Sequence, residues 1–104
     1  MTPIILTNCI DVPEFIKEWP EFRTLNDCSR LKFQVGMEVS IRHNQEYFRI
    51  RIEELATDTI IIGTVLTSEQ YIYFEQPFTE LDLVQFERKN VFDVYDIDRW
   101  GVKL

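Results

Sequence analysis

The chain has 104 residues, of which 45% are hydrophobic and 28% charged, so its composition is that of one globular domain and not of a disordered chain. Its net charge of −7 argues against binding to nucleic-acid phosphates. Residues 1–51 carry seven basic and seven acidic side chains, whereas residues 52–104 carry four basic and eleven acidic ones. This imbalance favours a basic partner, or simply keeps the chain in solution.

Cysteine and histidine are too few for a metal site. Cys9 and Cys28 lie outside any C-x-x-C pattern, and His43 is the only histidine. No hydrophobic signal segment follows Met1, which predicts a cytoplasmic chain with both thiols reduced. No apolar run is long enough to span a bilayer. We therefore expect no metal, no cofactor and no membrane partner.

The first third of the chain predicts a short helix between extended or irregular segments. Residues 3–6 favour a short edge strand, and Asp11 is a candidate helix cap. The apolar stripe at helical spacing consists of Phe15, Ile16 and Trp19. Pro20 limits this helix to about two turns, because proline disfavours helical backbone in the residue before it. We expect residues 21–33 to form a loop, with room for one turn of helix.

Residues 37–52 predict a β-hairpin that turns at Asn44-Gln45. The inner pairs would be Met37 with Ile52, Val39 with Ile50 and Ile41 with Phe48. The outer pairs would be Glu38 with Arg51 as an ion pair, Arg42 with Tyr47 as a cation–aromatic pair, and Ser40 with Arg49. A slip of one residue would move every side chain to the wrong face, so the pattern fixes the register. A longer loop stays open, because Asn-Gly and not Asn-Gln is the preferred turn sequence.

The next segments predict two further strands. Residues 59–66 favour a central strand that is buried on both sides, with a bulge or kink at Gly63. Residues 71–74 favour a strand whose Tyr71 and Tyr73 share one face, and residues 77–82 favour a loop.

The last segments complete the predicted sheet. Residues 83–87 favour a strand with Val84 and Phe86 facing inward, residues 88–90 turn the chain, and residues 91–97 form a helical turn or a final strand. About five short strands with tight connections predict a mainly β fold, a small antiparallel SH3-like barrel preceded by a short N-terminal helix. The expected single domain, 1–104, consists of a helix and loop extension at 1–34, the barrel at 35–97 and a tail at 98–104.

Several segments carry motifs of a known family. They are Pro20-Glu21-Phe22, Val35-Gly36-Met37-Glu38-Val39, Glu46-Tyr47-Phe48-Arg49-Ile50-Arg51-Ile52, Ile61-Ile62-Gly63-Thr64-Val65-Leu66, Leu81-Asp82-Leu83-Val84-Gln85-Phe86-Glu87 and Asn90-Val91-Phe92-Asp93-Val94. In this order they resemble the DUF2314-type family of small β-barrel proteins of large DNA viruses and bacteria, over residues 20–97. The resemblance implies a fold close to an SH3-like barrel and no established catalytic activity.

The chain departs from the pattern of that family in four places. The two Gly-Asp turns of the family are Gly36-Met37 and Leu81-Asp82 here, its tryptophan after phenylalanine is Arg49, and its asparagine is replaced at Leu66-Thr67. A ligand pocket that used this tryptophan and asparagine is therefore not expected in this chain.

No motif with a catalytic mechanism occurs in the sequence. His43 could serve as a general base and a cysteine as a nucleophile, but nothing places them together, and a solvated histidine beside the hairpin turn is the preferred interpretation. The aspartates near the C-terminal end lack the glycine and glutamate of a calcium loop and indicate an acidic, solvated tail. Those aspartates are Asp93, Asp96 and Asp98.

The candidate partner-binding residues are Arg42, Tyr47, Arg49, Tyr71 and Tyr73. Exposed tyrosines bury area at low entropic cost and suit an interface, although they could instead pack against the N-terminal helix. The acidic residues near them argue against a nucleic-acid surface. Within the predicted hairpin, Arg49 alone would lack a charged or aromatic partner across the strand.

We therefore expect a non-enzymatic, acidic protein-binding module that occupies a protein partner stoichiometrically, as inhibitors, immunity proteins and viral accessory proteins do. The alternative is a barrel that binds a small ligand or nucleotide among Arg49, Arg51, Tyr47 and Tyr73. An enzyme that uses His43 or a cysteine is the third hypothesis.

Overall fold

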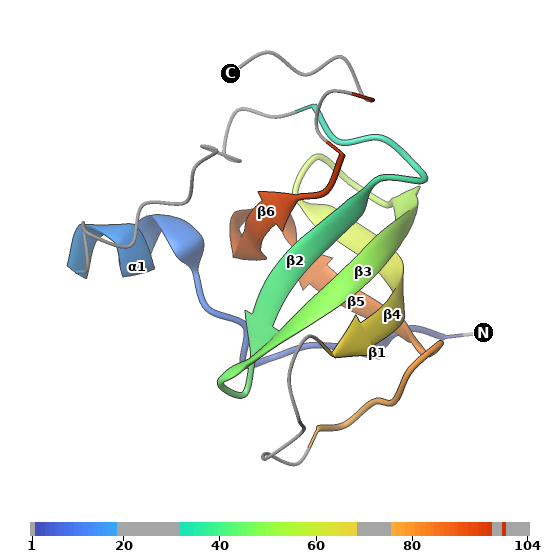
Figure 1. Cartoon of the computed structure of the whole chain (residues 1–104), viewed down its shortest axis with the longest axis horizontal. Helices are drawn as coiled ribbons and strands as arrows, with labels where there is room; N and C mark the ends of the chain where they lie inside the picture. Colours follow the sequence, from blue (N-terminus) through green and yellow to red (C-terminus); the bar gives the residue numbers. More distant parts are fainter. Residues whose placement is uncertain (1, 19–31, 69–75, 97–98, 100–104) are drawn as a thin grey trace.

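The computed structural model describes residues 2–18, 32–68, 76–96 and 99. The elements in chain order are β1 (Ile4–Ile5), α1 (Val12–Glu18), β2 (Glu38–His43), β3 (Glu46–Leu55), β4 (Ile60–Ser68), β5 (Leu83–Glu87), the 3-10 helix η3 (Arg88–Asn90) and β6 (Val91–Val94). The strands in this part of the chain form one six-stranded sheet in the order β1-β5-β4-β3-β2-β6. The helix α1 lies to one side of the sheet, near β6 (Figure 1).

The predicted mainly β class is confirmed, but the sheet is mixed. β1 runs parallel to β5, whereas every other pair of strands is antiparallel. The prediction of antiparallel strands is therefore wrong for this one pair, because the N-terminal segment adds to the sheet beside β5, a strand distant in sequence. The ladders of paired strands leave the sheet open between β1 and β6.

The hairpin of β2 and β3 has the predicted register and turn. Glu38 pairs with Arg51, and the pairing continues without a shift to His43 and Glu46 beside the turn. Asn44 and Gln45 have φ angles of 47° and 69°, which is the left-handed backbone that a two-residue hairpin turn requires. The inner side chains are at most 2% exposed: Met37, Val39, Ile41, Phe48, Ile50 and Ile52. They form the centre of the core.

β4 lies between β3 and β5, as predicted for a central strand. The prediction that β4 is buried on both sides is wrong, because buried Ile61 and Val65 alternate with half-exposed Ile60 and Ile62. The outer side of the sheet is therefore only partly covered here. The bulge predicted at Gly63 lies instead in the neighbouring strand β3, where the register shifts between Ile52 and Glu54.

Gly63 lies opposite Ile52, beside this shift. A Cβ atom at Gly63 would lie 2.5 Å from Ile50 Cγ2 and 2.6 Å from the Arg51 carbonyl oxygen. The close approach of β3 and β4 therefore explains the glycine.

The C-terminal elements largely match their predictions. Residues 83–87 form β5 with Val84 and Phe86 buried, residues 88–90 form η3, and the strand β6 is the correct one of the two alternatives for residues 91–97. Residues 77–82 form a loop. The predicted strand at residues 71–74 and most of the predicted loop at 21–33 lie outside the described residues.

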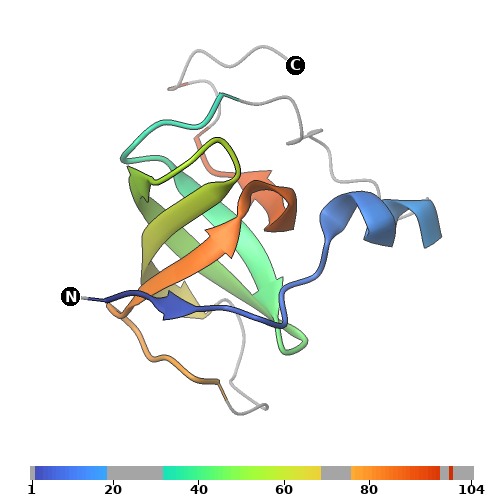
Figure 2. The same cartoon turned by 180° about the vertical axis from the view of Figure 1, so that it is seen from behind.

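The N-terminal segment contacts two strands that are far apart in the order of the sheet, β5 and β2. Ile4 pairs with Val84 of β5, and the Leu6 amide donates to the Gln85 carbonyl (2.9 Å). Further along, Cys9 forms an isolated bridge with His43 of β2. Figure 2 shows this segment crossing from β5 to the hairpin turn before the chain enters α1. The predicted edge strand and two-turn helix are both confirmed. No helix among the described residues is long and apolar enough to cross a membrane.

Candidate functional site

The predicted outer face of the hairpin begins with Arg42 and Tyr47, which form the expected pair. The Arg42 guanidinium carbon lies 5.4 Å from the centroid of the Tyr47 ring. Tyr47 in turn meets Phe92 of β6 edge to face at 5.5 Å, and Phe92 meets Phe15 of α1 at 5.6 Å. Tyr47 therefore belongs to a row of aromatic rings that attaches α1 to the sheet.

The expectation that Arg49 lacks a partner is wrong. Its Nε atom lies 2.6 Å from Glu38 Oε1, and its guanidinium carbon lies 4.1 Å from the centroid of the Tyr95 ring. The predicted ion pair of Glu38 with Arg51 is also wrong, because Arg51 binds Glu53 at 2.7 Å instead. The backbone register is as predicted, but long arginine side chains reach diagonal neighbours as easily as opposed ones.

The structure thus brings Arg42, Tyr47 and Arg49 onto one face, where each already has an intramolecular contact. Tyr71 and Tyr73 lie outside the described residues. Among Arg42, Tyr47 and Arg49, the buried Nε of Arg42 has no hydrogen-bond partner within the described part of the chain. The contacts of these three residues therefore do not by themselves indicate a ligand site.

The prediction of a solvated His43 is wrong, since this residue is only 2% exposed. Its Nδ1 lies 2.8 Å from Gln76 Oε1, and Gln76 Nε2 donates to the His43 carbonyl (3.1 Å). The Phe78 ring packs against the imidazole at 5.7 Å. The N-terminal segment and the 76–82 loop cover this end of the hairpin. The residues near the turn do not predict this cover, so His43 was expected to be exposed.

Cys9 is half-buried, and its thiol is free. Burial raises the pKa of Cys9 from 9.0 to about 12, with a smaller contribution from the negative charge of Glu87. The thiol is therefore protonated at neutral pH, which is unsuitable for a nucleophile. Cys28 lies outside the described residues, and in the described ranges no three histidine, cysteine or acidic side chains form a group that could hold a metal ion.

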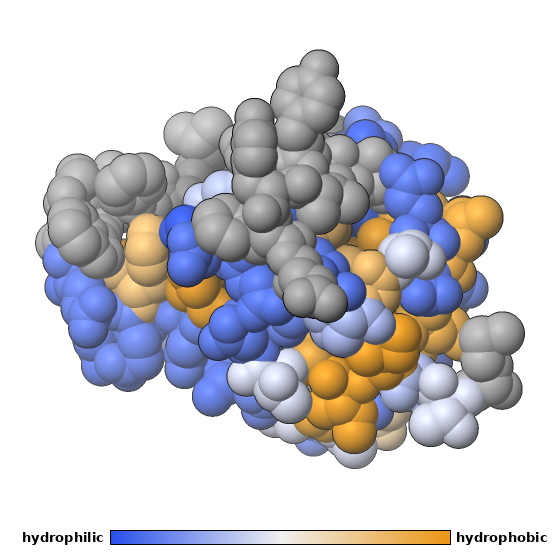
Figure 3. Space-filling model, turned by 90° about the horizontal axis from the view of Figure 1, so that it is seen from below, coloured by the Kyte–Doolittle hydropathy of each residue, from blue (hydrophilic) through white to orange (hydrophobic). Residues whose placement is uncertain are grey.

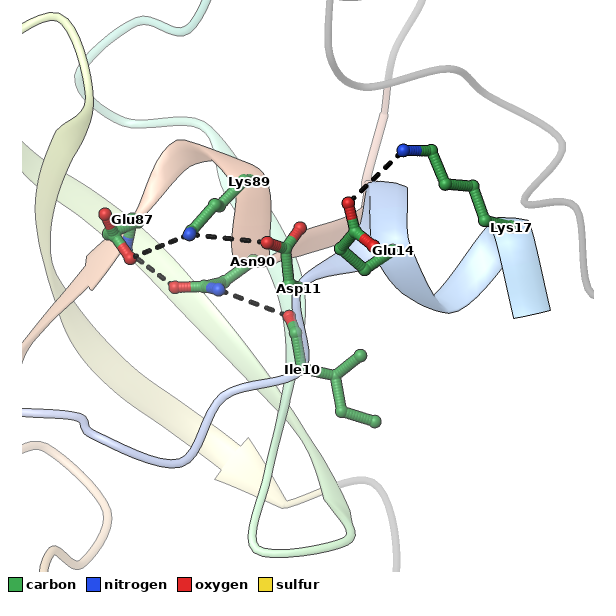
Figure 4. A network of polar contacts seen from close by, with 7 residues as sticks. All are labelled: Ile10, Asp11, Glu14, Lys17, Glu87, Lys89 and Asn90. Carbon is green, nitrogen blue, oxygen red and sulfur yellow. Dashed lines mark hydrogen bonds and ion pairs between the residues drawn. The ribbon is translucent and has the colours of Figure 1, made fainter. Parts of the chain in front are cut away.

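A polar network connects the start of α1 with η3 (Figure 4). Lys89 Nζ lies 3.3 Å from Asp11 Oδ2 and 3.7 Å from Glu87 Oε2. Asn90 accepts a hydrogen bond from the Glu87 amide (2.8 Å) and donates one to the Ile10 carbonyl (3.2 Å). These contacts attach the N-terminal segment to the sheet and indicate a structural role for the network.

Leu81 was not among the predicted site residues, and it is the most unusual residue of the described surface. It is 75% exposed and has a φ of 70°, a left-handed conformation that favours glycine. Its amide donates to the Val65 carbonyl (2.6 Å), and the next residue, Asp82, accepts a hydrogen bond from the Thr79 amide. The one feature of the sequence that pointed to this residue is that Leu81-Asp82 stands where the family that the chain resembles has a Gly-Asp turn.

The side of the molecule that carries β1 and the 76–82 loop has an apolar area. Viewed from below, apolar residues gather into a continuous area among hydrophilic ones (Figure 3). Ile5 of β1 is 63% exposed, and both β1 and the 76–82 loop lie in the lower part of Figure 1. Gln85 and Ile62 follow Ile5 across the outer side of β5 and β4.

Comparison with protein-family models, with curated proteins and with solved structures found no match. The resemblance to the DUF2314-type family therefore stays a prediction from the sequence.

Proposed function

We propose that this protein is a non-enzymatic binding module that attaches to a protein partner through the apolar surface around Leu81 and Ile5. The observation that carries this proposal is the conformation of Leu81. A residue with a Cβ atom in left-handed backbone costs about 1–2 kcal/mol, and glycine avoids this cost. Because the Leu81 side chain is largely exposed, its packing within the described residues does not offset this cost. Contact of the side chain with a partner would offset it.

Charge specifies the kind of partner. Leu81 lies between the acidic residues Glu80 and Asp82, in the half of the chain that carries the whole net charge. A second copy of the chain would bring like charges together, which opposes self-association. The complementary partner is a protein with an apolar patch that is bordered by basic residues.

The test uses Leu81→Gly, which removes the side chain and also relieves the backbone strain. A partner captured by the immobilised native protein at low salt is purified, and its affinity is measured by calorimetry. We expect Leu81→Gly to weaken binding by at least about tenfold, the loss typical of an interface residue worth more than 1 kcal/mol. The matched control is Val35→Asn, which removes an apolar side chain that is 58% exposed. Val35 belongs to the segment that leads into β2, and Figure 1 shows this segment at the end of the molecule opposite the 76–82 loop.

The proposal would be contradicted if no protein is captured at low salt, or if the captured protein binds Leu81→Gly as tightly as the native chain. Equal losses for Leu81→Gly and Val35→Asn would also count against a specific surface.

The same proposal includes an SH3-like barrel as the fold. The order β5-β4-β3-β2-β6 supports it, since four consecutive strands form a meander and the last strand returns beside the first of them. The short helix η3 before β6 and the N-terminal segment between β5 and β2 support it too. The cytoplasmic location expected from the sequence belongs to this proposal as well.

The alternative of an anion site at the hairpin loses support from the geometry. Arg49 and Arg51 already bind Glu38 and Glu53, so an anionic ligand would compete with carboxylates of the protein.

A further inference from the structure

A hollow of about 500 Å³ lies at the end of the molecule where β3 turns into β4. Three separate segments line it: the residues that lead into β2, the β3–β4 turn and the start of η3. The lining residues are Lys32, Phe33, Leu55, Ala56, Thr57, Asp58, Ile61 and Arg88. Its volume falls in the range of roughly 300–1,000 Å³ that is common for small-molecule sites.

The basic side chains of the hollow are unusual in this acidic protein. Eight lysines and arginines lie in the described residues, and Lys17, Arg49, Arg51 and Lys89 are among those that form ion pairs. Lys32 and Arg88 line the hollow, and neither forms an ion pair with any residue that the structure describes. The site therefore presents positive charge without a bound carboxylate.

Arg88 is held in place by an aromatic ring. Its guanidinium carbon lies 4.8 Å from the centroid of the Phe33 ring, and its amide donates to the Thr59 carbonyl (2.7 Å). Phe33 is 4% exposed and is part of the core. A fixed guanidinium is better prepared for a carboxylate than a freely moving lysine is, because less conformational entropy is lost on binding.

The remaining lining determines the size and charge of the ligand. Leu55, which is 41% exposed, and Ala56 provide apolar surface at the mouth. The Thr57 hydroxyl oxygen accepts from the amides of Thr59 and Ile60, so it stabilises the turn. Asp58 contributes the one carboxylate of the lining and reduces the charge of the hollow to that of a single cation. A ligand with several negative charges is therefore disfavoured.

We infer that the hollow binds a small organic carboxylate with an aromatic or branched apolar group. The carboxylate lies at Arg88 and Lys32, and the apolar group lies against Leu55 and Ala56. This site is separate from the surface around Leu81 and does not depend on the protein-binding function.

The first experiment uses the native chain and two-dimensional amide NMR with phenylacetate as the probe. We expect saturable shifts of the signals of Phe33, Thr57 and Arg88, with a dissociation constant of about 1 mM or lower. Acetate lacks the ring, and phenylacetamide lacks the charge, so each should bind at least about tenfold more weakly. Equal binding of all three compounds, or shifts only outside the hollow, would overturn the inference.

The second experiment compares two variants that lose the same charge. Arg88→Gln should weaken phenylacetate binding by at least about tenfold, whereas Arg51→Gln on the outer face of β3 should not change it. Arg88→Lys should restore part of the affinity because it keeps the charge. If Arg88→Gln does not fold, Lys32→Gln with Lys17→Gln as its control makes the same comparison. Unchanged affinity in the variants of the hollow would overturn the inference, and unchanged binding in Leu81→Gly would confirm that the two surfaces are independent.

Discussion

Leu81 allows backbone strain to be measured apart from side-chain contacts. We predict that Leu81→Gly raises the free energy of unfolding by about 0.5–1 kcal/mol, because relief of the left-handed strain exceeds the extra entropy of glycine in the unfolded chain. Urea unfolding followed by circular dichroism measures the change. Gly36 serves as the control, because it also has a positive φ of 96° but already is a glycine. Gly36→Ala should therefore lower the free energy of unfolding. A destabilised Leu81→Gly would show that the leucine side chain has a stabilising role in the free protein.

Gly63 is predicted to tolerate no larger residue. In Gly63→Ala the added methyl group would meet Ile50 Cγ2 and the backbone of Arg51, so β3 and β4 would have to move apart. We expect a loss of about 1–3 kcal/mol, the cost typical of overpacking, in the same unfolding measurement. A change below about 0.5 kcal/mol, the usual effect of a surface substitution, would show that the two strands separate easily here.

Cys9 gives a prediction for alkaline pH. Its pKa of about 12 in the folded chain lies above the ordinary value of 9.0, so the folded state holds the proton more tightly than the unfolded state does. This contribution to stability is fully present below pH 9 and is lost as the pH rises from 9 towards 12. Between pH 8 and pH 10 the native chain should lose about 1 kcal/mol more than Cys9→Ala does. Identical pH dependence of the two chains would contradict this assignment.

At the scale of the element, the hairpin of β2 and β3 offers a direct test of turn chemistry. Gln45 has a φ of 69°, and asparagine followed by glycine is the preferred sequence for such a turn. Gln45→Gly should therefore stabilise the protein by about 0.4–1 kcal/mol. Thermal unfolding provides the measurement. Gln45→Val is the control and should destabilise, because a β-branched residue is strained at positive φ. Equal melting temperatures of Gln45→Gly and Gln45→Val would mean that the turn relaxes in solution.

The hairpin also shows what the sequence could and could not predict. Alternating side chains defined the two faces of β2 and β3, and the two-residue turn then fixed every backbone pair. The ion pairs of Arg49 and Arg51 could not be predicted from the backbone register. Arg49 contacts both Glu38 and Tyr95, and Tyr95 lies in the chain after β6, outside the hairpin. The hollow at Arg88 could not be predicted from the sequence either, because its lining comes from three segments that meet only in the folded chain.

At the scale of the whole molecule, Asn90 connects the N-terminal segment to the turn between β5 and β6. It is 5% exposed and bonds both the Glu87 amide and the Ile10 carbonyl. Asn90→Ala would leave both groups without this partner, and we expect it to lower the stability by about 2–3 kcal/mol in urea unfolding. Asn90→Asp keeps the acceptor for the Glu87 amide but turns a carboxylate oxygen towards the Ile10 carbonyl, so it should lose at least as much stability. A clearly smaller loss in Asn90→Asp would mean that the contact with Ile10 contributes little.

The mainly β class could be predicted because short alternating segments follow one another along the chain. The parallel pairing of β1 with β5 could not, because two residues at the start of the chain carry no information about which distant strand they join. The burial of His43 has the same origin: its surroundings come from Cys9 on one side and Gln76 on the other, both far away in sequence.

The pairing of Ile4 with Val84 also sets an order of events during synthesis. The β2–β3 hairpin closes over a short loop and can form soon after it leaves the ribosome. β1 is synthesised before β5 and has no strand to pair with until β5 has emerged, roughly 4–16 s later at the usual rate of translation. During that time the apolar residues of the N-terminal segment stay exposed. The nascent chain is therefore a better substrate for chaperones than the folded protein is, and β1 joins the sheet later than the hairpin of β2 and β3 can form.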